Sequence, residues 1–206
     1  AQMVGDEPEF GAIDLPGLNP DMASLRSSVA AFRPRIEQAM RERYGLEVLA
    51  VYAYPAQVVF CVRPFQSLAD LRGRRVRTAA APQSNFVEAL GGIPVVIPFA
   101  AIVENVRRGV VDCAITGTMS GNSVGLHEAT SYVSGLAISW GIGVFLANGD
   151  AWRGLAEPVR ALLRRELPVL EAEIWESAER ETGEGLACNA GAPECVGGRR
   201  GRMMVV

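Results

Sequence analysis

Apolar residues recur every three or four positions over residues 23–44, which predicts an amphipathic helix. The apolar positions are Leu25, Val29, Phe32, Ile36 and Met40. Gly45 follows the pattern directly and is a typical residue for ending a helix, and Pro34 predicts a kink within it. Arginine and glutamate occupy the other face, which we expect to be solvated.

The pattern then changes to short apolar runs rich in valine and aromatic residues, at 47–52 and 58–62, which are typical of strands. A regular alternation follows, with strands predicted at 75–79, 95–97 and 110–115 and helices at 85–90 and 101–108. This β-α-β-α-β order predicts an α/β fold with a parallel sheet. In such sheets, ligands bind beyond the carboxyl ends of the strands.

The last third of the chain contains one long helical pattern, at about 152–181, with Asp150 as the expected cap and Pro168 as a kink. Residues 129–149 carry no formal charge and are long enough to cross a bilayer. Their serines, threonine, asparagine and glycines favour two buried strands instead. We therefore expect no direct insertion into a membrane.

Composition excludes several kinds of function. The 206 residues carry a net charge of −3, so no basic face for binding nucleic acid is predicted. All 20 basic residues are arginine, which excludes a lysine Schiff base or a P-loop lysine. Because His127 is the one histidine, sites built from several imidazoles are excluded too. We predict neither a metal site nor a cofactor.

The four cysteines fall into two kinds. Cys61 and Cys113 lie in apolar runs, where a buried free thiol is expected. Cys188 and Cys195 flank a loop rich in glycine, proline and asparagine, and we expect a disulfide between them in an oxidising compartment.

An enzymatic alternative comes from Gly121-Asn-Ser123-Val-Gly125, which matches the Gly-x-Ser-x-Gly turn that presents the nucleophile of serine hydrolases. In that alternative Ser123 attacks the substrate. The match lacks partners, because the histidine of such a triad follows the acid in the chain, whereas His127 lies four residues after Ser123. We therefore do not expect Ser123 to act as a catalytic nucleophile.

Four arginines cluster at positions 72, 74, 75 and 77. Strand alternation places Arg75 and Arg77 on the same face of the strand predicted at 75–79. A buried guanidinium needs an anionic partner, because an unpaired buried charge is costly. That partner is either an acid of the chain or a ligand carboxylate that accepts two parallel hydrogen bonds.

A series of motifs resembles the solute-binding proteins of tripartite ATP-independent periplasmic (TRAP) transporters. The motifs are Asp70-Leu-Arg-Gly-Arg-Arg-Val-Arg77, Glu88-Ala-Leu-Gly-Gly-Ile-Pro94-Val-Val-Ile-Pro98-Phe99, Asn105-Val-Arg-Arg-Gly109-Val-Val-Asp112 and His127-Glu-Ala-Thr-Ser-Tyr132-Val. Asp14-Leu-Pro16 and Arg63-Pro64 fit flanking positions of the family, and Trp152-x-x-Leu155 fits its C-terminal part.

The resemblance implies a two-lobed α/β periplasmic protein, not an enzyme, that closes on an organic acid and delivers it to membrane permease subunits. Residues 1–56 would be the remainder of the first lobe and a crossover, and 57–138 the second lobe. Residues 139–206 would form the return crossover, the long helix and the C-terminal segment. The chain starts where the family has already built its first β-α-β unit. We therefore expect part of the first lobe to be missing, which would weaken binding or leave a non-binding remnant.

The resemblance also implies site residues. The family's carboxylate-binding arginine falls on Arg77, and its ligand-facing aromatic residue falls on Phe99. Thr116 takes the place of a ligand-contacting asparagine, and Gln57 lies where a second arginine is common. Fewer charged or amide contacts remain than in the family, which favours a monocarboxylate with an apolar tail over a dicarboxylate. Three further candidates follow or lie on predicted strands at the same edge: Ser120, Asn122 and Trp140.

Overall fold

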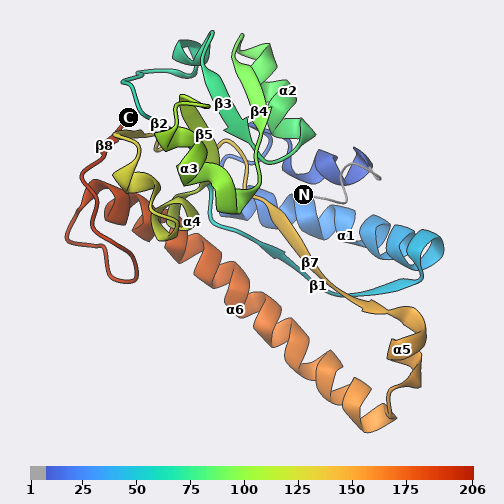
Figure 1. Ribbon diagram of the computed structural model, residues 1–206. Coiled ribbons are helices and arrows are strands. Elements are labelled where there is room, and N and C mark those ends of the chain that lie inside the picture. The colour runs from blue at the N-terminus through green and yellow to red at the C-terminus, as the bar shows by residue number, and fades with distance from the viewer. Residues whose placement is uncertain (1–7) are drawn as a thin grey trace.

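The computed structural model describes residues 8–206, in which helices connect two β-sheets (Figure 1). Within these residues, the larger sheet has six strands and the smaller is a two-stranded antiparallel ribbon. The larger sheet has the spatial order β4 (Ile93–Val96), β3 (Arg75–Thr78), β5 (Cys113–Gly117), β2 (Gln57–Cys61), β6 (Tyr132–Val133) and β8 (Met204–Val205). The ribbon pairs β1 (Leu46–Ala53) with β7 (Ile142–Asn148).

The centre of the larger sheet confirms the predicted β-α-β-α-β unit. Strand β3 pairs in parallel with β4 on one side and β5 on the other, and the connections contain α2 (Ala81–Ala89) and α3 (Ile102–Arg107). The sheet as a whole is mixed, because β2 runs antiparallel to both β5 and β6. Two parallel strands need a long crossover to join them, and α2 and α3 lie in these crossovers. Strand β2 needs no such crossover, because it follows β1 of the ribbon after the short connection 54–56.

Helix α1 (Met22–Tyr44) confirms the first predicted helix at both ends. The Asp21 side chain accepts a hydrogen bond from the backbone of Ser24, and Gly45 ends the helix with a positive φ of 64°. The predicted apolar positions form its buried face and pack in one core with side chains of the ribbon and the larger sheet. Pro34 lies inside the helix as predicted.

The single long helix predicted over residues 152–181 is two helices. Helix α5 (Gly149–Gly154) is capped by Asn148 rather than by Asp150, and α6 (Glu157–Ala190) starts after a two-residue break. Pro158 lies in the first turn of α6, where its missing N–H costs nothing. Helix α6 runs along the ribbon and ends against α4 (Thr118–Ser123) (Figure 1). Near the C-terminal end of α6, Gly185 has no Cβ and packs directly on the backbone of α4.

Short 3-10 turns complete the connections: η1 (Pro8–Asp14), η2 (Leu68–Leu71), η3 (Phe99–Ala101) and η4 (Leu126–Glu128). Turn η3 takes up the start of the predicted helix 101–108, so α3 begins at Ile102. The uncharged residues 129–149 contain two strands, β6 and β7, as predicted, but β7 is half-buried rather than buried. No helix within residues 8–206 is both long and apolar enough to span a membrane.

The cysteine prediction is half wrong. Cys188 and Cys195 form the expected disulfide, but Cys61 and Cys113 form a second one. The antiparallel pairing of β2 with β5 places these two residues directly opposite each other, with Cα atoms 4.1 Å apart. Apolar surroundings indicated burial correctly, since both side chains are fully buried. Those surroundings carry no information about strand register, which decides the pairing.

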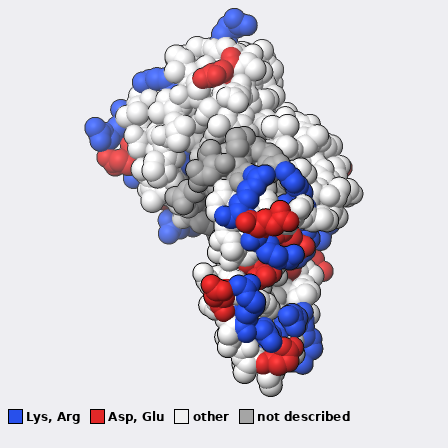
Figure 2. All heavy atoms as spheres, turned by 90° about the vertical axis from the view of Figure 1, so that its right-hand side faces the viewer, with Lys and Arg blue, Asp and Glu red and all other residues white. Residues whose placement is uncertain are grey.

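Charged side chains of both signs alternate over the narrow lower part of the molecule in Figure 2, which α5 and the first half of α6 build. Several are paired there, including Arg153 with Asp150 and Arg160 with Glu157. This part of the surface is therefore a solvated, mixed-charge face rather than a continuous basic one.

Candidate ligand-binding cavity

A cavity of about 850 Å³ lies between the ribbon side of the molecule and the larger sheet. Its walls come from η1, α1 and β7 on one side and from β2, β3, β4 and β5 with their following turns on the other. It opens beyond the carboxyl ends of the parallel strands, where the sequence analysis expects a ligand. Five of the seven predicted site residues line it: Arg77, Phe99, Thr116, Gln57 and Ser120.

Arg77 is buried in the wall of this cavity, with 4% of its surface exposed. Its Nε donates to the carbonyl oxygen of Ile97 at 2.9 Å, and Nη1 donates to that of Ile115 at 2.7 Å. These carbonyls follow β4 and belong to β5, so the two flanking strands fix the guanidinium in place. Burial lowers the pKa of Arg77 to about 10, and the side chain stays charged at neutral pH.

Arg75 and Arg77 differ in their partners. Arg75 donates from Nε and Nη2 to the carboxylate of Asp112, outside the cavity. Within residues 8–206 no carboxylate forms an ion pair with Arg77, and no hydrogen bond to its Nη2 is found. An acid of the chain therefore neutralises Arg75, whereas Arg77 presents an unneutralised cation to the cavity.

Neutral residues surround Arg77. Phe99 is 45% exposed at the start of η3 and lies at the cavity rather than in the core. Thr116 is buried near the end of β5. Gln57 donates from Nε2 to the carbonyl oxygen of Pro55. Ser120 lies in the first turn of α4, close to the backbone of Gly117.

Asp14 is a cavity residue that the sequence analysis treats only as part of a flanking motif. One carboxylate oxygen accepts a hydrogen bond from the backbone N–H of Trp140 at 2.7 Å, and the other accepts one from Gly141 at 2.6 Å. Burial raises the pKa of Asp14 to about 6 despite these two bonds. The signal in the sequence is an acid set among the apolar residues Ile13 and Leu15.

The raised pKa of Asp14 predicts a pH dependence of stability. The folded pKa of about 6 exceeds the ordinary value of 3.8, so the folded protein binds the proton more tightly. The free energy of unfolding of the ligand-free protein therefore falls as pH rises from about 4 to about 6, by up to about 3 kcal/mol from this group. Urea unfolding between pH 4 and 7 gives the free energy of unfolding at each pH. Its decrease with pH should be steeper in the wild type than in Asp14→Asn, which lacks the titrating carboxyl. Identical pH profiles for the two proteins would contradict it.

Gln83 and Ser139 are two further cavity residues that the sequence analysis missed. Gln83 accepts a hydrogen bond from the backbone of Ala79, and its Nε2 donates to Ser139 Oγ at 3.3 Å. Gln83 lies at the start of α2, just after β3. The rule that ligands bind beyond the carboxyl ends of parallel strands could have identified it.

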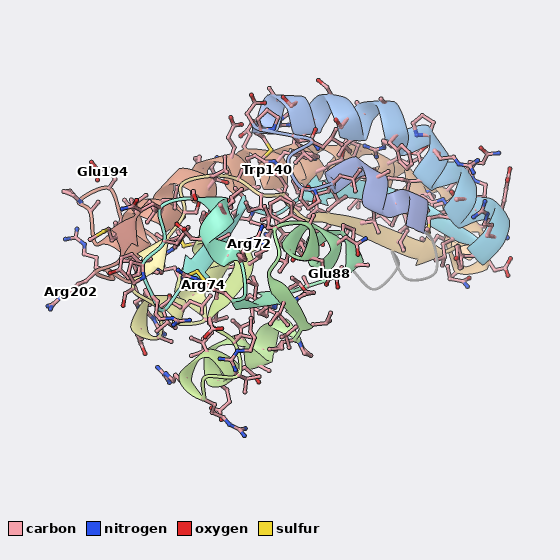
Figure 3. All side chains as sticks on the ribbon, turned by 90° about the horizontal axis from the view of Figure 1, so that it is seen from above. Arg72, Arg74, Glu88, Trp140, Glu194 and Arg202 are labelled. Atoms are coloured by element: carbon pink, nitrogen blue, oxygen red, sulfur yellow. A yellow bond between two sulfur atoms is a disulfide. The ribbon has the colours of Figure 1, made fainter. Side chains whose placement is uncertain are left out.

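Trp140 and Asn122 do not line the cavity, and we remove them from the candidate site. Figure 3 shows Trp140 in the interior near the start of α1. Its ring is buried, and Nε1 donates to the carbonyl oxygen of Asn19. Trp140 therefore packs η1 and α1 against the crossover into β7, and its backbone supports Asp14.

Asn122 instead holds the C-terminal segment. It is fully buried on α4, where Nδ2 donates to Asn189 Oδ1 and to the carbonyl oxygen of Arg199, and Oδ1 accepts from the backbone N–H of Arg199. These bonds fasten residues around 199 to α4 and α6. Asn122 does follow a strand, as predicted, but its side chain points into this hydrogen-bond network and not into the cavity.

We predict that Asn122→Ala lowers the free energy of unfolding without weakening ligand binding. The substitution leaves the buried Oδ1 of Asn189 and the part-buried backbone N–H and carbonyl of Arg199 without their partner, which costs about 1–3 kcal/mol. Urea unfolding measures the loss, and calorimetric titration with a bound acid measures affinity. A large loss of affinity at unchanged stability would return Asn122 to the site.

The serine-hydrolase arrangement is not formed. Ser123 is the last residue of helix α4 and donates to the carbonyl oxygen of Met119, whereas the expected turn joins a strand to a helix. His127 is buried in η4, and its Nδ1 has no hydrogen-bond partner within the described residues. Ser123 and His127 therefore form no nucleophile–base pair.

Comparison with known proteins gives one family and one fold. The family model of bacterial extracellular solute-binding proteins, family 7 (DctP), matches residues 1–187. The ectoine-binding periplasmic protein TeaA of Halomonas elongata is 25% identical over 122 residues, which are 59% of this chain and 36% of that protein.

Two solved structures share the fold. DctP7, a Bordetella pertussis extracytoplasmic solute receptor binding pyroglutamic acid, has a TM-score of 0.89 and 22% identity, covering 98% of this chain and 64% of that one. A TRAP periplasmic solute-binding protein from Rhodoferax ferrireducens with bound malonate has a TM-score of 0.84 and 18% identity, covering 100% of this chain and 63% of that one. The chain thus spans less than two thirds of the length of these relatives, and the predicted α/β fold with its long C-terminal helix is confirmed.

The family match spans most of the chain and confirms the resemblance seen in its motifs. Because the family consists of extracellular binding proteins, the predicted periplasmic location is confirmed and the hydrolase alternative is wrong. The chain belongs to the DctP family of bacterial extracellular solute-binding proteins.

Proposed function

We propose that this chain captures an organic acid through Arg77 and delivers it to the permease subunits of a TRAP transporter. The observation that carries the proposal is the buried guanidinium of Arg77, which faces the cavity with no carboxylate partner in residues 8–206. A charged donor held by two carbonyls in a partly dry cavity is suited to a carboxylate, because charge-assisted hydrogen bonds are stronger there than in water.

The rest of the cavity wall supports a ligand with an apolar part. Phe10, Ile36 and Met40 line it from one side, and Val96 and Phe99 line it from the other. No second arginine lines the cavity within residues 8–206, so a second carboxylate has no charged partner there. We therefore favour a monocarboxylate over a dicarboxylate. Related receptors that bind pyroglutamic acid and L-gulonate support a carboxylate ligand in general.

The cavity walls come from both sheets, in keeping with two lobes that close around the ligand. On this proposal, residues 57–138 form the second lobe, 1–56 belong to the first lobe and its crossover, and 139–206 return through α6. Binding would then weaken if part of the first lobe were absent, as one side of the acid would stay exposed.

Native mass spectrometry of protein purified without refolding tests the proposed function. We expect a co-purified acid of low mass that is released on denaturation, and a specific affinity for that acid by calorimetric titration. A protein that carries no acid and binds none from a panel of organic acids would be the non-binding remnant, and would refute the proposal.

A further inference from the structure

The cavity holds a second unneutralised charge, of opposite sign to Arg77. Asp14 lines the same cavity, and no basic side chain within residues 8–206 forms an ion pair with it. Arg77 and Asp14 do not pair with each other either, since no contact of 4.0 Å or less joins their charged atoms. One open cavity is therefore lined by a fixed cation and a fixed anion that form no ion pair with each other.

The carboxylate of Asp14 is positioned rather than mobile. Its two oxygens are held by the consecutive backbone N–H groups of Trp140 and Gly141, at the crossover that leads into β7. Each carboxylate oxygen can accept a second hydrogen bond. Because Asp14 lines the cavity, this remaining capacity is available to a donor that enters it.

The two backbone hydrogen bonds anchor the Asp14 carboxylate, but they do not remove the cost of placing its charge in a desolvated position. The cost of that charge is visible in the pKa of Asp14, which burial raises to about 6. A cationic group in the cavity would offset this cost, just as a carboxylate would offset that of Arg77.

Resting on the proposed function of this site, we propose that the ligand is a zwitterion, with a carboxylate held by Arg77 and a positively charged nitrogen held by Asp14. Arg77 lies at the ends of the parallel strands and Asp14 at the opposite wall, in η1. A ligand that spans them bridges the two sides of the cavity. Binding would thus join η1 and the β7 crossover to the larger sheet through one small molecule.

Matched ligands test the proposal. The first series is butanoate with its 2-amino, 3-amino and 4-amino derivatives, which place the nitrogen at three distances from the carboxylate. The second is 4-phenylbutanoate with the same three amino derivatives, whose ring supplies surface for the apolar wall. Calorimetric titration at pH 7.5 should show at least one amino derivative binding at least about tenfold more tightly than its parent acid.

Asp14→Asn assigns that preference to the carboxylate. This variant should lose the preference for the amino derivative, measured as the ratio of the dissociation constants of the two ligands on the same variant. Asp112→Asn is the matched control, because it makes the same change at a carboxylate outside the cavity, and it should keep the preference. Thermal unfolding of both variants verifies that they are folded. Should Asp14→Asn fail to fold, the preference measured on the wild-type protein still decides between the two kinds of ligand.

The outcomes separate this inference from the proposed function. Parent acids that bind through Arg77 as tightly as their amino derivatives would overturn the zwitterion and keep the organic-acid receptor. A preference that survives in Asp14→Asn would overturn the assignment to Asp14. If no member of either series binds and no acid co-purifies, the proposed function fails and the inference fails with it.

Discussion

Arg77→Ala is expected to weaken binding of the ligand carboxylate by about 30-fold or more. The substitution leaves the carboxylate unpaired in a partly desolvated cavity, which costs roughly 2–5 kcal/mol of binding free energy. Calorimetric titration of the wild type and the variant with the co-purified acid gives the ratio of dissociation constants. Arg77→Lys should recover only part of the loss, because an ammonium cannot reproduce the planar two-bond contact of a guanidinium.

The effect of Arg77→Ala on folding should be smaller than its effect on binding. Removing the guanidinium leaves the carbonyl oxygens of Ile97 and Ile115 without these donors, which lowers the free energy of unfolding. It also removes a buried cation that no acid of residues 8–206 neutralises, which raises stability. These two contributions oppose each other, and thermal unfolding of the ligand-free variant measures their sum.

Arg75→Ala is the control for Arg77→Ala. Arg75 lies two residues earlier on the same strand, but its guanidinium binds Asp112 outside the cavity. We expect unchanged ligand affinity in this variant. If Arg77→Ala binds the acid normally but unfolds at a lower temperature than the wild type, Arg77 is a structural residue and the proposed site is wrong.

Local signals explain why so much of the fold could be predicted. Helix α1 carries its apolar period and its terminal glycine within its own sequence, and both are found in the structure. The β-α-β-α-β unit is likewise predicted from short apolar runs, with glycines before β4 and β5. The boundary between α5 and α6 was missed, although Gly154 at the end of α5 and Pro158 in the first turn of α6 are typical residues for such a boundary.

Site residues could be predicted where their position along a strand determines their role. They could not be predicted where contacts with residues far away in the sequence determine it. Alternation identified Arg75 and Arg77 together but could not separate them. Asp112, 37 residues further along, separates them by neutralising Arg75 alone. Asp14 was not predicted as a site residue for the same reason. Its position depends on hydrogen bonds from the backbone of residues 140 and 141, which lie more than 120 positions away.

Removal of the Cys61–Cys113 disulfide is expected to cost more stability than removal of the Cys188–Cys195 disulfide. The first joins residues 52 positions apart and the second joins residues 7 apart. A crosslink restricts the unfolded chain more as the loop it closes grows, which gives about 4 kcal/mol for the first and about 2.5 kcal/mol for the second. Alanine at both positions of a pair suits the test, because serine would bury an unsatisfied hydroxyl between β2 and β5.

Urea unfolding of the two double variants, Cys61→Ala with Cys113→Ala and Cys188→Ala with Cys195→Ala, measures this difference under non-reducing conditions. Both disulfides need an oxidising compartment, in agreement with the periplasmic location of the family. Thiol counting on denatured wild-type protein should therefore find no free cysteine. Two free thiols located at Cys61 and Cys113 by peptide mapping would mean that these residues are unbonded despite facing each other across β2 and β5. The stability of the larger sheet would then rest on its apolar core alone, and the first double variant should unfold like the wild type.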